Sequence, residues 1–383
     1  MGGVQHSTLL LSEQLLSTKK AIVNILFPGE GKFSQICKKK NIPYDIYNSI
    51  KQSSISLTLF NEKVKILNPV AITKNVICMV YNSYFIRKKI YILKPDVIIS
   101  KGLLNHITSG LSCIGLKMPL IWHLQDLISG KYFGFLRFIF KVLGSFLSSK
   151  IICDGKIIIS SLSKNHNKKY VFLPNGVDVE SFKRNRSAGK ILRKELNIPS
   201  ESYLITNVAR ITKWKGQIHL LNAFVEYSKI NLNSYLLLVG SPLFTNDNYY
   251  KSLLNIIRKN HIEDRVILPG YRDDINNVLS ASDLFLYSSI EKDTLPLSLL
   301  SAMSSSLPVA ISKIDSLIDI FELMPDIDRF DFSAEDEIVN IIQKYEKKEN
   351  RILSGKKNYL ISKENFDISK HTKAFLNIIK NTN

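Results

Sequence analysis

Short blocks of apolar residues alternate with blocks of mixed polar and apolar residues in the second half of the chain. The apolar blocks are rich in β-branched and aromatic residues and end in proline, glycine or serine, which predicts short buried strands. The mixed blocks between them have helical spacing. The predicted elements are, in chain order, a strand at 266–268, a helix at 273–282, a strand at 283–287, a helix at 297–303 and a strand at 307–311. This succession predicts a parallel α/β sheet.

A polar loop with two carboxylates, Glu291 and Asp293, joins the second of these strands to the helix at 297–303. Parallel sheets bind their ligands at the carboxyl ends of the strands, where this loop lies. The N–H groups of a helix N-terminus attract phosphate, and a neighbouring carboxylate suits sugar hydroxyls. The loop therefore predicts a site for a phosphorylated sugar, with simple helix capping as the alternative interpretation of the two carboxylates.

Other stretches of the same half have the same character. Arg210 follows a predicted strand, and Lys215 precedes a predicted helix at 217–227, so two cations stand at a strand end. The apolar run 236–239 ends in Gly240, which indicates a close approach of two backbone segments. Further upstream, the Asn-Gly pair at 175–176 indicates a turn, because both residues tolerate positive φ.

Together these stretches resemble, in order, the donor-site half of the retaining group 1 (family 4) glycosyltransferases. That family places two acidic residues eight positions apart before an Ala-Met pair. Asp293 matches the first acidic position, Ala302 and Met303 match the pair, and Ser301 stands at the second acidic position. The resemblance covers 170–312 continuously. It implies the GT-B fold, an α/β fold with two Rossmann-like parallel-sheet domains that face a cleft.

The resemblance also implies a domain organisation. The expected parts are an N-terminal acceptor-side domain at 1–173, a C-terminal nucleotide-sugar-binding domain at 174–365, and a C-terminal helix at 366–383 that crosses back to the first domain. Family members have a strand just before their first glycine loop, whereas here a helix at 5–17 follows Gly2 and Gly3 directly. We therefore expect the first strand of the N-terminal domain to be missing, through truncation or a misassigned start.

The same resemblance implies roles for individual residues. His123 and Asp126, at the end of a predicted strand, would line the reaction centre together with Asp293, and Gln125 is the alternative occupant of the histidine position. Cations near the departing diphosphate would stabilise the negative charge that develops on it. The residues implied for donor binding are Gly2, Gly3, Arg210, Lys215, Gly240, Thr294, Leu295, Leu297 and Ser301.

The function implied is that of a retaining, metal-independent hexosyltransferase. It would move a sugar from a UDP- or GDP-sugar to a lipid-linked or saccharide acceptor, in the assembly of a cell-surface polysaccharide such as lipopolysaccharide or capsule. No cofactor and no metal are expected. Asp326-Ile327-Asp328 resembles the metal-binding DxD of a different glycosyltransferase fold, but it follows the last strand expected for the second domain and is interpreted as coincidence.

Ser301 supports an alternative function. A serine hydroxyl is a weaker and shorter hydrogen-bond acceptor than the carboxylate that the family uses for the donor ribose. A degenerate, non-catalytic relative acting as a binding or scaffold protein is therefore the second hypothesis. A nucleotide-sugar epimerase on the same fold would need another set of acid and base residues, and the sequence offers none that is convincing.

Charge is distributed unevenly along the 383 residues. Residues 1–174 hold 24 Lys+Arg against 7 Asp+Glu, a net charge of +17, while residues 175–383 hold 28 against 26, a net charge of +2. A basic first domain predicts an anionic acceptor or an anionic membrane surface, on which the lysine runs 38–40 and 87–89 and a predicted helix at 133–147 could rest. Alternatively, the helix at 133–147 belongs to the core of the protein, and the lysines of the two runs are merely solvated. Nucleic acid is not expected, because the basic residues form no stripe and no motif.

The four cysteines, Cys37, Cys78, Cys113 and Cys153, show no metal-binding spacing and are expected to be buried thiols in a reducing compartment. No apolar run is long enough to span a bilayer, and no signal peptide is recognised. We expect a cytoplasmic protein, with peripheral attachment to the inner face of the plasma membrane as an option. The donor base, the sugar, the acceptor, the linkage and the oligomeric state are not fixed by these motifs.

Overall fold

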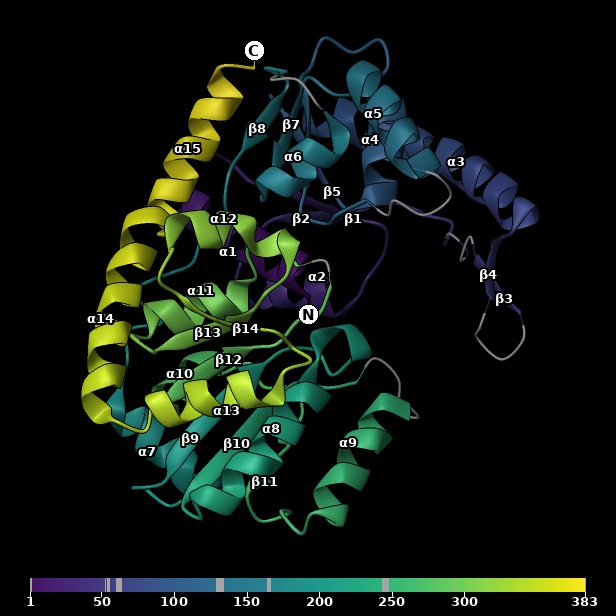
Figure 1. Ribbon diagram of the computed structural model, residues 1–383. Helices are drawn as coiled ribbons and strands as arrows, with labels where there is room; N and C mark the ends of the chain where they lie inside the picture. Colours follow the sequence, from purple (N-terminus) through teal and green to yellow (C-terminus); the bar gives the residue numbers. More distant parts are fainter. Residues whose placement is uncertain are drawn as a thin grey trace. The chain divides into compact units, whose positions relative to one another are not determined.

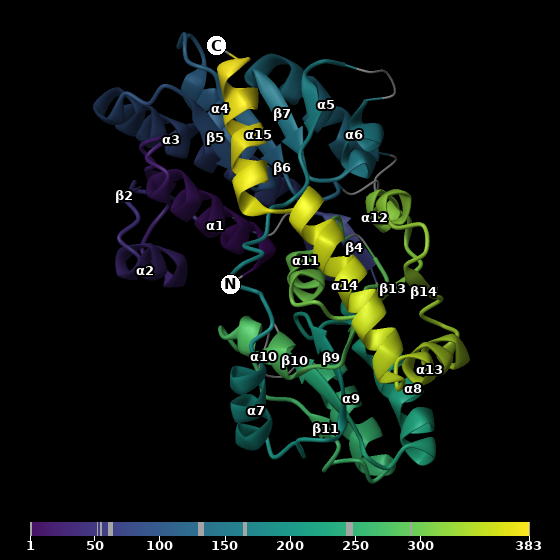
Figure 2. The same ribbon diagram turned by 90° about the vertical axis from the view of Figure 1, so that its left-hand side faces the viewer.

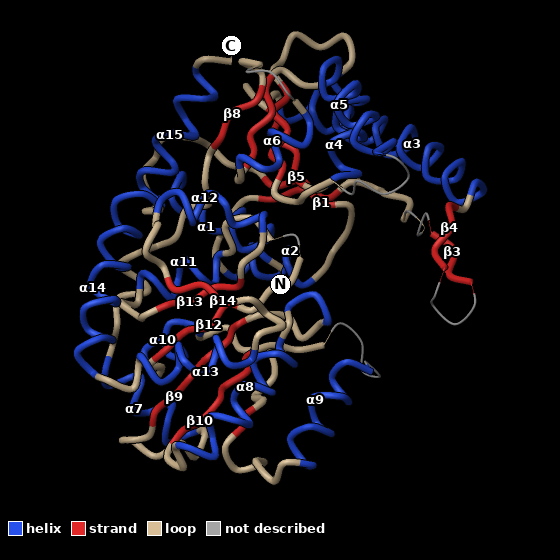
Figure 3. The backbone as a smooth tube through the Cα atoms, viewed as in Figure 1, coloured by secondary structure: helices blue, strands red, loops and turns tan. Residues whose placement is uncertain are grey.

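The computed structural model describes residues 2–51, 53, 56–59, 64–128, 134–163, 167–242, 248–291 and 293–382. It has two compact units. The N-terminal unit comprises Met1–Leu173 and Thr372–Asn383, and the C-terminal unit comprises Pro174–His371. Figures 1 and 2 show the ribbon from two sides, and Figure 3 distinguishes helices from strands.

The described strands of the N-terminal unit form three separate sheets. β1 (Ile25–Phe27) pairs in parallel with β2 (Tyr44–Ile46), and β3 (Ser56–Leu59) pairs antiparallel with β4 (Val64–Leu67). The third sheet is parallel and runs in the order β5 (Ile98–Lys101), β6 (Leu120–Leu124), β7 (Lys150–Cys153), β8 (Tyr170–Phe172). Within the described residues β1 and β5 are both edge strands, and both are only half-buried, whereas β6 is buried throughout. The expectation of a missing first strand stays a prediction.

Helices cover both faces of the four-stranded sheet. The helices of this unit are α1 (Gly3–Ser17), α2 (Lys32–Lys39), α3 (Pro69–Leu93), α4 (Leu103–Cys113), α5 (Phe135–Leu147), α6 (Lys156–Leu162) and most of α15 (Ile368–Lys380). Along β6, Ile121 faces α1 and α15, where it packs against Phe375, while Trp122 faces the opposite layer, where it packs against Phe140 of α5. Side chains of a strand alternate between its faces, so a strand that is apolar at every position needs cover on both sides. In Figure 2, α15 (yellow) lies over this sheet.

The C-terminal unit contains one parallel sheet of six described strands in the order β11-β10-β9-β12-β13-β14. The strands are β9 (Tyr203–Val208), β10 (Ser234–Val239), β11 (Val266–Ile267), β12 (Leu284–Tyr287), β13 (Val309–Ser312) and β14 (Asp328–Phe330). The three strands predicted from the apolar blocks are therefore confirmed, as β11, β12 and β13. They are shorter than the blocks, because the residues that flank each strand form the turns into the next helix.

Helices lie on both faces of this sheet as well. They are α7 (Arg186–Glu195), α8 (Gln217–Ile230), α9 (Asn248–Lys259), α10 (Ile275–Ala281), α11 (Leu297–Ser304), α12 (Ile318–Leu323), α13 (Glu335–Lys344) and α14 (Lys348–Asn365). One apolar core includes Phe224 and Tyr227 of α8, and the other includes Leu192 of α7 and Val278 of α10. The helices predicted at 217–227, 273–282 and 297–303 are confirmed, with ends that differ by no more than three residues.

The two chain segments that lead out of the C-terminal unit run side by side. The Val177 N–H donates to the Phe366 carbonyl at 2.8 Å, and the Ile368 N–H donates to the Val177 carbonyl at 2.9 Å. A Cβ atom added to Gly176 would lie 2.9 Å from side-chain atoms of Ile368 and His371. The prediction of a turn at 175–176 is wrong, because the chain runs through these residues without a turn and neither has a positive φ. The close approach of the other chain segment is what leaves no room for a side chain at Gly176.

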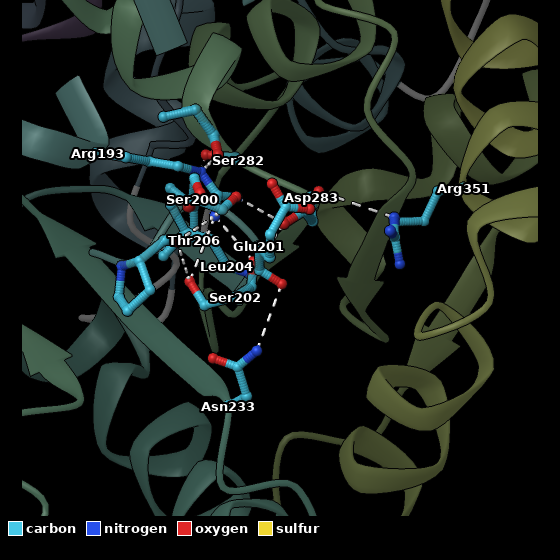
Figure 4. Close-up of polar contacts among 12 residues, drawn as sticks. Arg193, Ser200, Glu201, Ser202, Leu204, Thr206, Asn233, Ser282, Asp283 and Arg351 are labelled. Atoms are coloured by element: carbon cyan, nitrogen blue, oxygen red, sulfur yellow. Dashed lines mark hydrogen bonds and ion pairs between the residues drawn. The ribbon is translucent and has the colours of Figure 1, made fainter. Parts of the chain in front are cut away.

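A buried arginine joins the amino ends of β9 and β12 (Figure 4). Arg193 of α7 donates to the backbone carbonyls of Ala281 and Ser202, at 2.9 Å and 2.8 Å, and to the Asp283 carboxylate at 2.7 Å. Asp283 also accepts from the Leu204 N–H at 3.0 Å. A guanidinium has five donors in a rigid fork, so one side chain can hold two strands and a helix together.

Arg193→Ala should lower the local free energy of opening of β9 and β12 by about 1.5–3 kcal/mol, because several carbonyls would lose their charged donor. Asp283 would lose its closest cation and keep only the more distant Arg184 and Arg351, at 3.9 Å and 3.8 Å. Hydrogen–deuterium exchange of the amides of these two strands measures this. Lys229→Ala, which removes the exposed pair with Glu226, is the control and should cost less than about 1 kcal/mol. Equal effects of the two substitutions would contradict the role given to Arg193.

Candidate functional site

The strand order places a switch point in the middle of the C-terminal sheet. From β9 the chain moves outward to β10 and β11, and it then returns to β12 on the other side of β9. The loops that leave the carboxyl ends of β9 and β12 therefore diverge, and ligands of open parallel sheets bind at such points. These two loops, 209–216 and 288–296, contain the cations and carboxylates singled out in the sequence.

A charge pair joins the two loops. The Lys215 ammonium, from the loop after β9, forms an ion pair with the Asp293 carboxylate, from the loop after β12. The Tyr287 hydroxyl and the Ser289 hydroxyl, the latter at 2.7 Å, donate to the same carboxylate oxygen, Oδ2. Within the described residues, the other oxygen of Asp293, Oδ1, accepts no hydrogen bond. Lys215, which is predicted to bind phosphate, and Asp293, which is predicted to bind the sugar, are thus direct neighbours.

Burial shapes the electrostatics of this pair. Desolvation lowers the pKa of Lys215 below the usual lysine range, while the Asp293 carboxylate opposes the shift and Arg210 adds to it. The Lys215 ammonium also lies 4.3 Å from the centre of the Trp214 ring, a favourable cation–π distance. Desolvation and Asp293 raise the pKa of Tyr287 well above its usual value, so Tyr287 stays a neutral donor.

Two glycines let the backbone segments around the site approach closely. A Cβ atom at Gly216 would lie 2.1 Å from the Ser288 carbonyl oxygen, and a Cβ atom at Gly240 would lie 1.9 Å from the Ala209 carbonyl oxygen. Gly216 also has a φ of 67°, in the region that favours glycine. The close approach inferred for Gly240 from the sequence is therefore confirmed, although the segment it approaches is backbone of the neighbouring loop.

The loop before α11 is held in an unusual conformation. Leu295 has a φ of 38°, which non-glycine residues rarely adopt, and it is buried. Its carbonyl accepts a hydrogen bond from the Asn175 side chain at 3.2 Å. α11 starts at Leu297 after Pro296, which offers no side-chain cap. In the first turn the Leu299 N–H donates to the Pro296 carbonyl at 3.0 Å. The N-terminus of α11 lies next to Thr294, and helix N-termini attract anions.

Sequence reasoning missed several polar groups of this site. Besides Tyr287, Ser289 and Asn175, these are buried acceptor atoms that make no hydrogen bond within the described residues: Asn207 Oδ1, Thr212 Oγ1 and Gln217 Oε1. All three belong to the end of β9, its loop or the start of α8. Buried polar atoms without partners are uncommon in proteins, and a ligand bound at this site is one source of the missing partners. Only their position after a predicted strand could have drawn attention to them.

Comparison with known families identifies the class of protein. Residues 190–358 match the family described as glycosyl transferases group 1. The match covers less than half of the chain, and curated relatives of the chain are likewise named glycosyltransferases. The matched segment includes both loops of the candidate site and α11, so the resemblance seen in the sequence is confirmed.

Two relatives from Escherichia coli illustrate the similarity. The UDP-Gal:alpha-D-GlcNAc-diphosphoundecaprenol alpha-1,3-galactosyltransferase is 28% identical over 226 residues, 54% of this chain and 56% of the relative. The O-antigen biosynthesis glycosyltransferase WclY is 27% identical over 234 residues, 59% of this chain and 61% of the relative. The matched region thus spans about three-fifths of the length of these curated relatives.

Solved structures show the same fold over almost the whole chain. HepE of Anabaena, in complex with UDP, superimposes with a TM-score of 0.80 and 18% identity, covering 99% of this chain and 96% of HepE. A glycosyltransferase of Rickettsia africae gives a TM-score of 0.79 and 16% identity, covering 100% and 95%. At such identities the likeness concerns the fold, and it confirms the expected GT-B fold of this glycosyltransferase.

The second acidic position of the family pattern lies in a tightly packed helix. Ser301 is buried in α11, and the serines after it hold the end of this helix: Ser304 bonds to Ser362 of α14 at 2.7 Å, and Ser305 donates to the Phe182 carbonyl at 2.8 Å. α14 approaches closely, since a Cβ atom at Gly355 would lie 2.0 Å from the Ser306 carbonyl oxygen. The run of serines therefore has a packing role, and the role of Ser301 toward a ribose stays a prediction.

The candidate residues of the N-terminal unit differ in their burial and in their position relative to the end of β6. His123 is buried on the face of β6 under α15, with its ring centre 6.4 Å from that of Phe375. Gln125, just beyond the strand, bonds to Ser7 of α1 at 3.0 Å, and Asp126 is exposed. Gln125 rather than His123 therefore stands at the open end of β6. The catalytic roles of His123, Asp126 and Asp293 stay predictions.

A lysine that sequence reasoning missed lies beside this strand end. Lys101, the last residue of β5, is in register with His123 and contacts the Ser7 hydroxyl at 3.5 Å. Burial lowers the pKa of Lys101 to about 7, while the Asp154 carboxylate opposes the shift. Nothing in the local apolar pattern distinguishes it from a solvated lysine.

The structure also places the two N-terminal glycines, the two aspartates of the DxD and the four cysteines. α1 begins at Gly3, where an added Cβ atom would meet nothing within 4 Å, so the glycine loop role of Gly2 and Gly3 stays a prediction. Asp326 and Asp328 form ion pairs with Lys357 and Lys344. The expectation that they follow the last strand of the second domain is wrong, because Asp328 begins β14, the strand at one edge of that sheet. Among the described residues no group of side chains could hold a metal ion, and no helix has the length and apolarity of a membrane span. All four cysteines are buried free thiols, as predicted.

The affinity for a diphosphate should fall as the pH rises through the lowered pKa of Lys215. The ammonium attracts the diphosphate, and the neutral amine does not. Because burial lowers this pKa, the loss should begin below about 10.4, where an ordinary lysine deprotonates, and should approach about tenfold per pH unit. Calorimetric titration with UDP between neutral and alkaline pH measures this.

Lys215→Arg is the control, since arginine keeps its charge throughout this range. Its affinity for UDP, whatever its magnitude at neutral pH, should not depend on pH. The wild-type affinity for UDP could also stay constant with pH up to the pKa of an exposed lysine. That result would show that Lys215 does not hold the diphosphate.

Proposed function

We propose that this protein is a retaining, metal-independent glycosyltransferase that moves a hexose from a UDP-sugar to an anionic, lipid-linked saccharide acceptor in the assembly of a cell-surface polysaccharide. The observation that carries this proposal is the switch-point site of the C-terminal unit. It combines the cations Lys215 and Arg210 with the N-terminus of α11 and the carboxylate of Asp293. Phosphates and a sugar are the ligand groups that this set of side chains matches.

UDP is the donor base that we favour over GDP. HepE, which shares the fold, binds UDP and glucose in its crystal structures. The similar galactosyltransferase of Escherichia coli uses UDP-Gal, according to its name. Both observations concern other proteins, and they make UDP-sugars the first donors to test.

The charge pair suggests how donor binding prepares the site. The diphosphate is a stronger anionic partner for Lys215 than the single carboxylate of Asp293. When Lys215 turns to the diphosphate, Asp293 keeps its hydrogen bonds from Tyr287 and Ser289 and gains freedom to accept from a sugar hydroxyl. Phosphate binding would thus expose the carboxylate that orients the sugar.

The reaction itself would be a substitution at the anomeric carbon. The bond from this carbon to the diphosphate breaks, and the diphosphate keeps the electron pair, with Lys215 and Arg210 neutralising the new charge. The acceptor oxygen forms the new bond on the same face of the sugar, and its proton passes to the departing diphosphate. His123, or Gln125 in its place, and Asp126 would line the reaction centre. The backbone of Gly2 and Gly3 would approach the donor phosphates.

The acceptor class is supported by charge and by the relatives. The N-terminal half of the chain carries a net charge of +17, which favours an anionic acceptor. The similar Escherichia coli enzymes are named for a diphosphoundecaprenol-linked substrate and for O-antigen biosynthesis. An acceptor of this kind would place the protein at the cytoplasmic face of the membrane.

A non-catalytic binding or scaffold protein is the second candidate function. One observation favours it, namely Ser301 at the position of the family's second carboxylate. Loss of one charge-assisted bond to a ribose would cost about 2 kcal/mol, or about 30-fold in affinity. Such a loss would weaken an enzyme without abolishing its activity.

Lys215→Ala should weaken UDP binding by about 10- to 100-fold, because one charged hydrogen-bond donor to the diphosphate is worth about 1.5–3 kcal/mol. Calorimetric titration with a panel of UDP- and GDP-sugars measures it and also identifies the base. Lys213→Ala is the matched control, since Lys213 is exposed two residues away, and it should leave the affinity unchanged. If the wild-type protein bound none of these donors, the scaffold function would be favoured.

Ser301→Glu should tighten binding of the donor, by about 30-fold if the carboxylate restores the full ribose contact. Ser298→Glu adds the same charge to the first turn of α11 and should give no such gain. The same titration measures both variants, and circular dichroism verifies that they are folded. A folded Ser301→Glu protein without tighter binding would mean that this face of α11 does not meet the ribose.

A further inference from the structure

The most exposed apolar surface of the described chain lies on α3. Five large apolar residues recur along the outward face of this helix, with exposed fractions between 55% for Tyr84 and 77% for Val70. Thr73, Lys74 and Lys88 are exposed between them. The outward residues of this stripe are Val70, Ile77, Val80, Tyr84 and Tyr91. Their spacing of three, four or seven residues places them in one line along the helix. We call this line the α3 stripe.

The opposite face of α3 is already used by the fold. Ile86 and Ile90 are buried in the core of the N-terminal unit, and Asn75 and Asn82 bond to the backbone of Ser53 and Ile50. α3 is therefore apolar on both faces, although only one of them has a partner within the described residues. A helix that is apolar all round is normally buried on all sides, so the α3 stripe calls for a partner outside this chain.

A second helix of the same layer has exposed apolar residues of its own. α3 packs on α4, and α4 packs on α5, so the three helices form one layer over the sheet, as Figures 1 and 3 also show. α5 has its own outward line of exposed residues, Phe135, Phe138, Val142 and Phe146. The helix predicted at 133–147 is thus partly buried and partly exposed, and the part of the prediction at Phe133 lies outside the described residues.

The charges of this layer all have the same sign. The helices α3, α4, α5 and α6 contain no aspartate and no glutamate. Their charged residues are Lys74, Arg87, Lys88, Lys89, Arg137, Lys141 and Lys156. Of these, Lys74, Lys88, Lys141 and Lys156 are exposed, and Lys88 lies 4.6 Å from the centre of the Tyr84 ring in the α3 stripe. Positive charge therefore borders and interrupts the apolar lines.

We propose that the α3 stripe and the outward line of α5 dock the protein on an anionic lipid leaflet. This inference rests on the proposed function, since it explains how an acceptor held in the membrane would reach the enzyme. Tyrosine rings suit the boundary between headgroups and acyl chains, and lysine stems extend along apolar surface while their charges meet lipid phosphates. α3 lies on the leaflet and does not cross it, in keeping with the absence of any membrane span among the described helices.

A second copy of the chain fits this surface less well. In a two-fold symmetric dimer the same patch faces itself, so the lysines of one layer would oppose those of the other. With no carboxylate in the four helices, nothing in the patch would compensate this repulsion. An anionic leaflet supplies the opposite charge instead, and each lysine near it contributes to binding.

Vesicle binding tests the proposal without any donor or acceptor. The full chain is floated with vesicles of phosphatidylcholine alone and with vesicles that also contain phosphatidylglycerol. Binding to the anionic vesicles is expected, with weaker binding at high salt. The double variant Ile77→Asp with Val80→Asp changes two exposed residues of the α3 stripe, and it should bind at least about tenfold more weakly.

The matched control is the double variant Ile352→Asp with Leu353→Asp. It adds the same two charges at exposed apolar positions of α14 and should bind vesicles like the wild type. Equal binding by both variants, or no binding by the wild type, would overturn the proposal. A wild-type dimer in sedimentation that the α3 variant dissociates would assign the stripe to a second copy instead. UDP titration of each variant shows separately whether the donor site, and thus the proposed function, is intact.

Discussion

The charge pair between Lys215 and Asp293 is the interaction on which the candidate site depends. It links two loops that diverge from the switch point of the sheet, and it can form only because Gly216 lets their backbones approach closely. Tyr287 and Ser289 add two donors to the same carboxylate, so the negative charge is held before any phosphate arrives. Preorganisation of this kind removes the cost of arranging charged groups at the moment of reaction.

Sequence reasoning located this site because its loops follow apolar strands, and because the family pattern fixed Lys215 and Asp293. It missed Tyr287, since a tyrosine in a buried apolar strand indicates core packing. Only the strand register shows that this residue is the last of β12, where its hydroxyl can reach the following loop. The amide of Asn175 was also missed, because its partner, the Leu295 carbonyl, is 120 residues away in the sequence.

The prediction of the fold from the sequence was limited for a similar reason. Local periodicity predicted the strands and helices of the C-terminal unit well, but it could not show that β11 and β12 lie on opposite sides of β9. In the N-terminal unit, β1 spans only Ile25–Phe27, which is too short for a clear pattern in the sequence. The 25-residue helix α3 was not predicted at all. A helix that is apolar on both faces gives no periodic signal, so the feature that hid α3 from sequence reasoning is the one that makes its surface informative.

The two halves of the chain meet negative charge in different ways. The C-terminal half is nearly neutral, so the diphosphate binding that we propose for it would depend on a few cations placed within contact distance. The N-terminal half carries most of the +19 net charge, and its exposed lysines act through a field that extends about one Debye length, roughly 8 Å in physiological salt. A contact site selects one ligand, whereas a diffuse field attracts an extended anionic surface. The charge distribution therefore matches a small soluble donor on one half and a membrane-bound acceptor on the other.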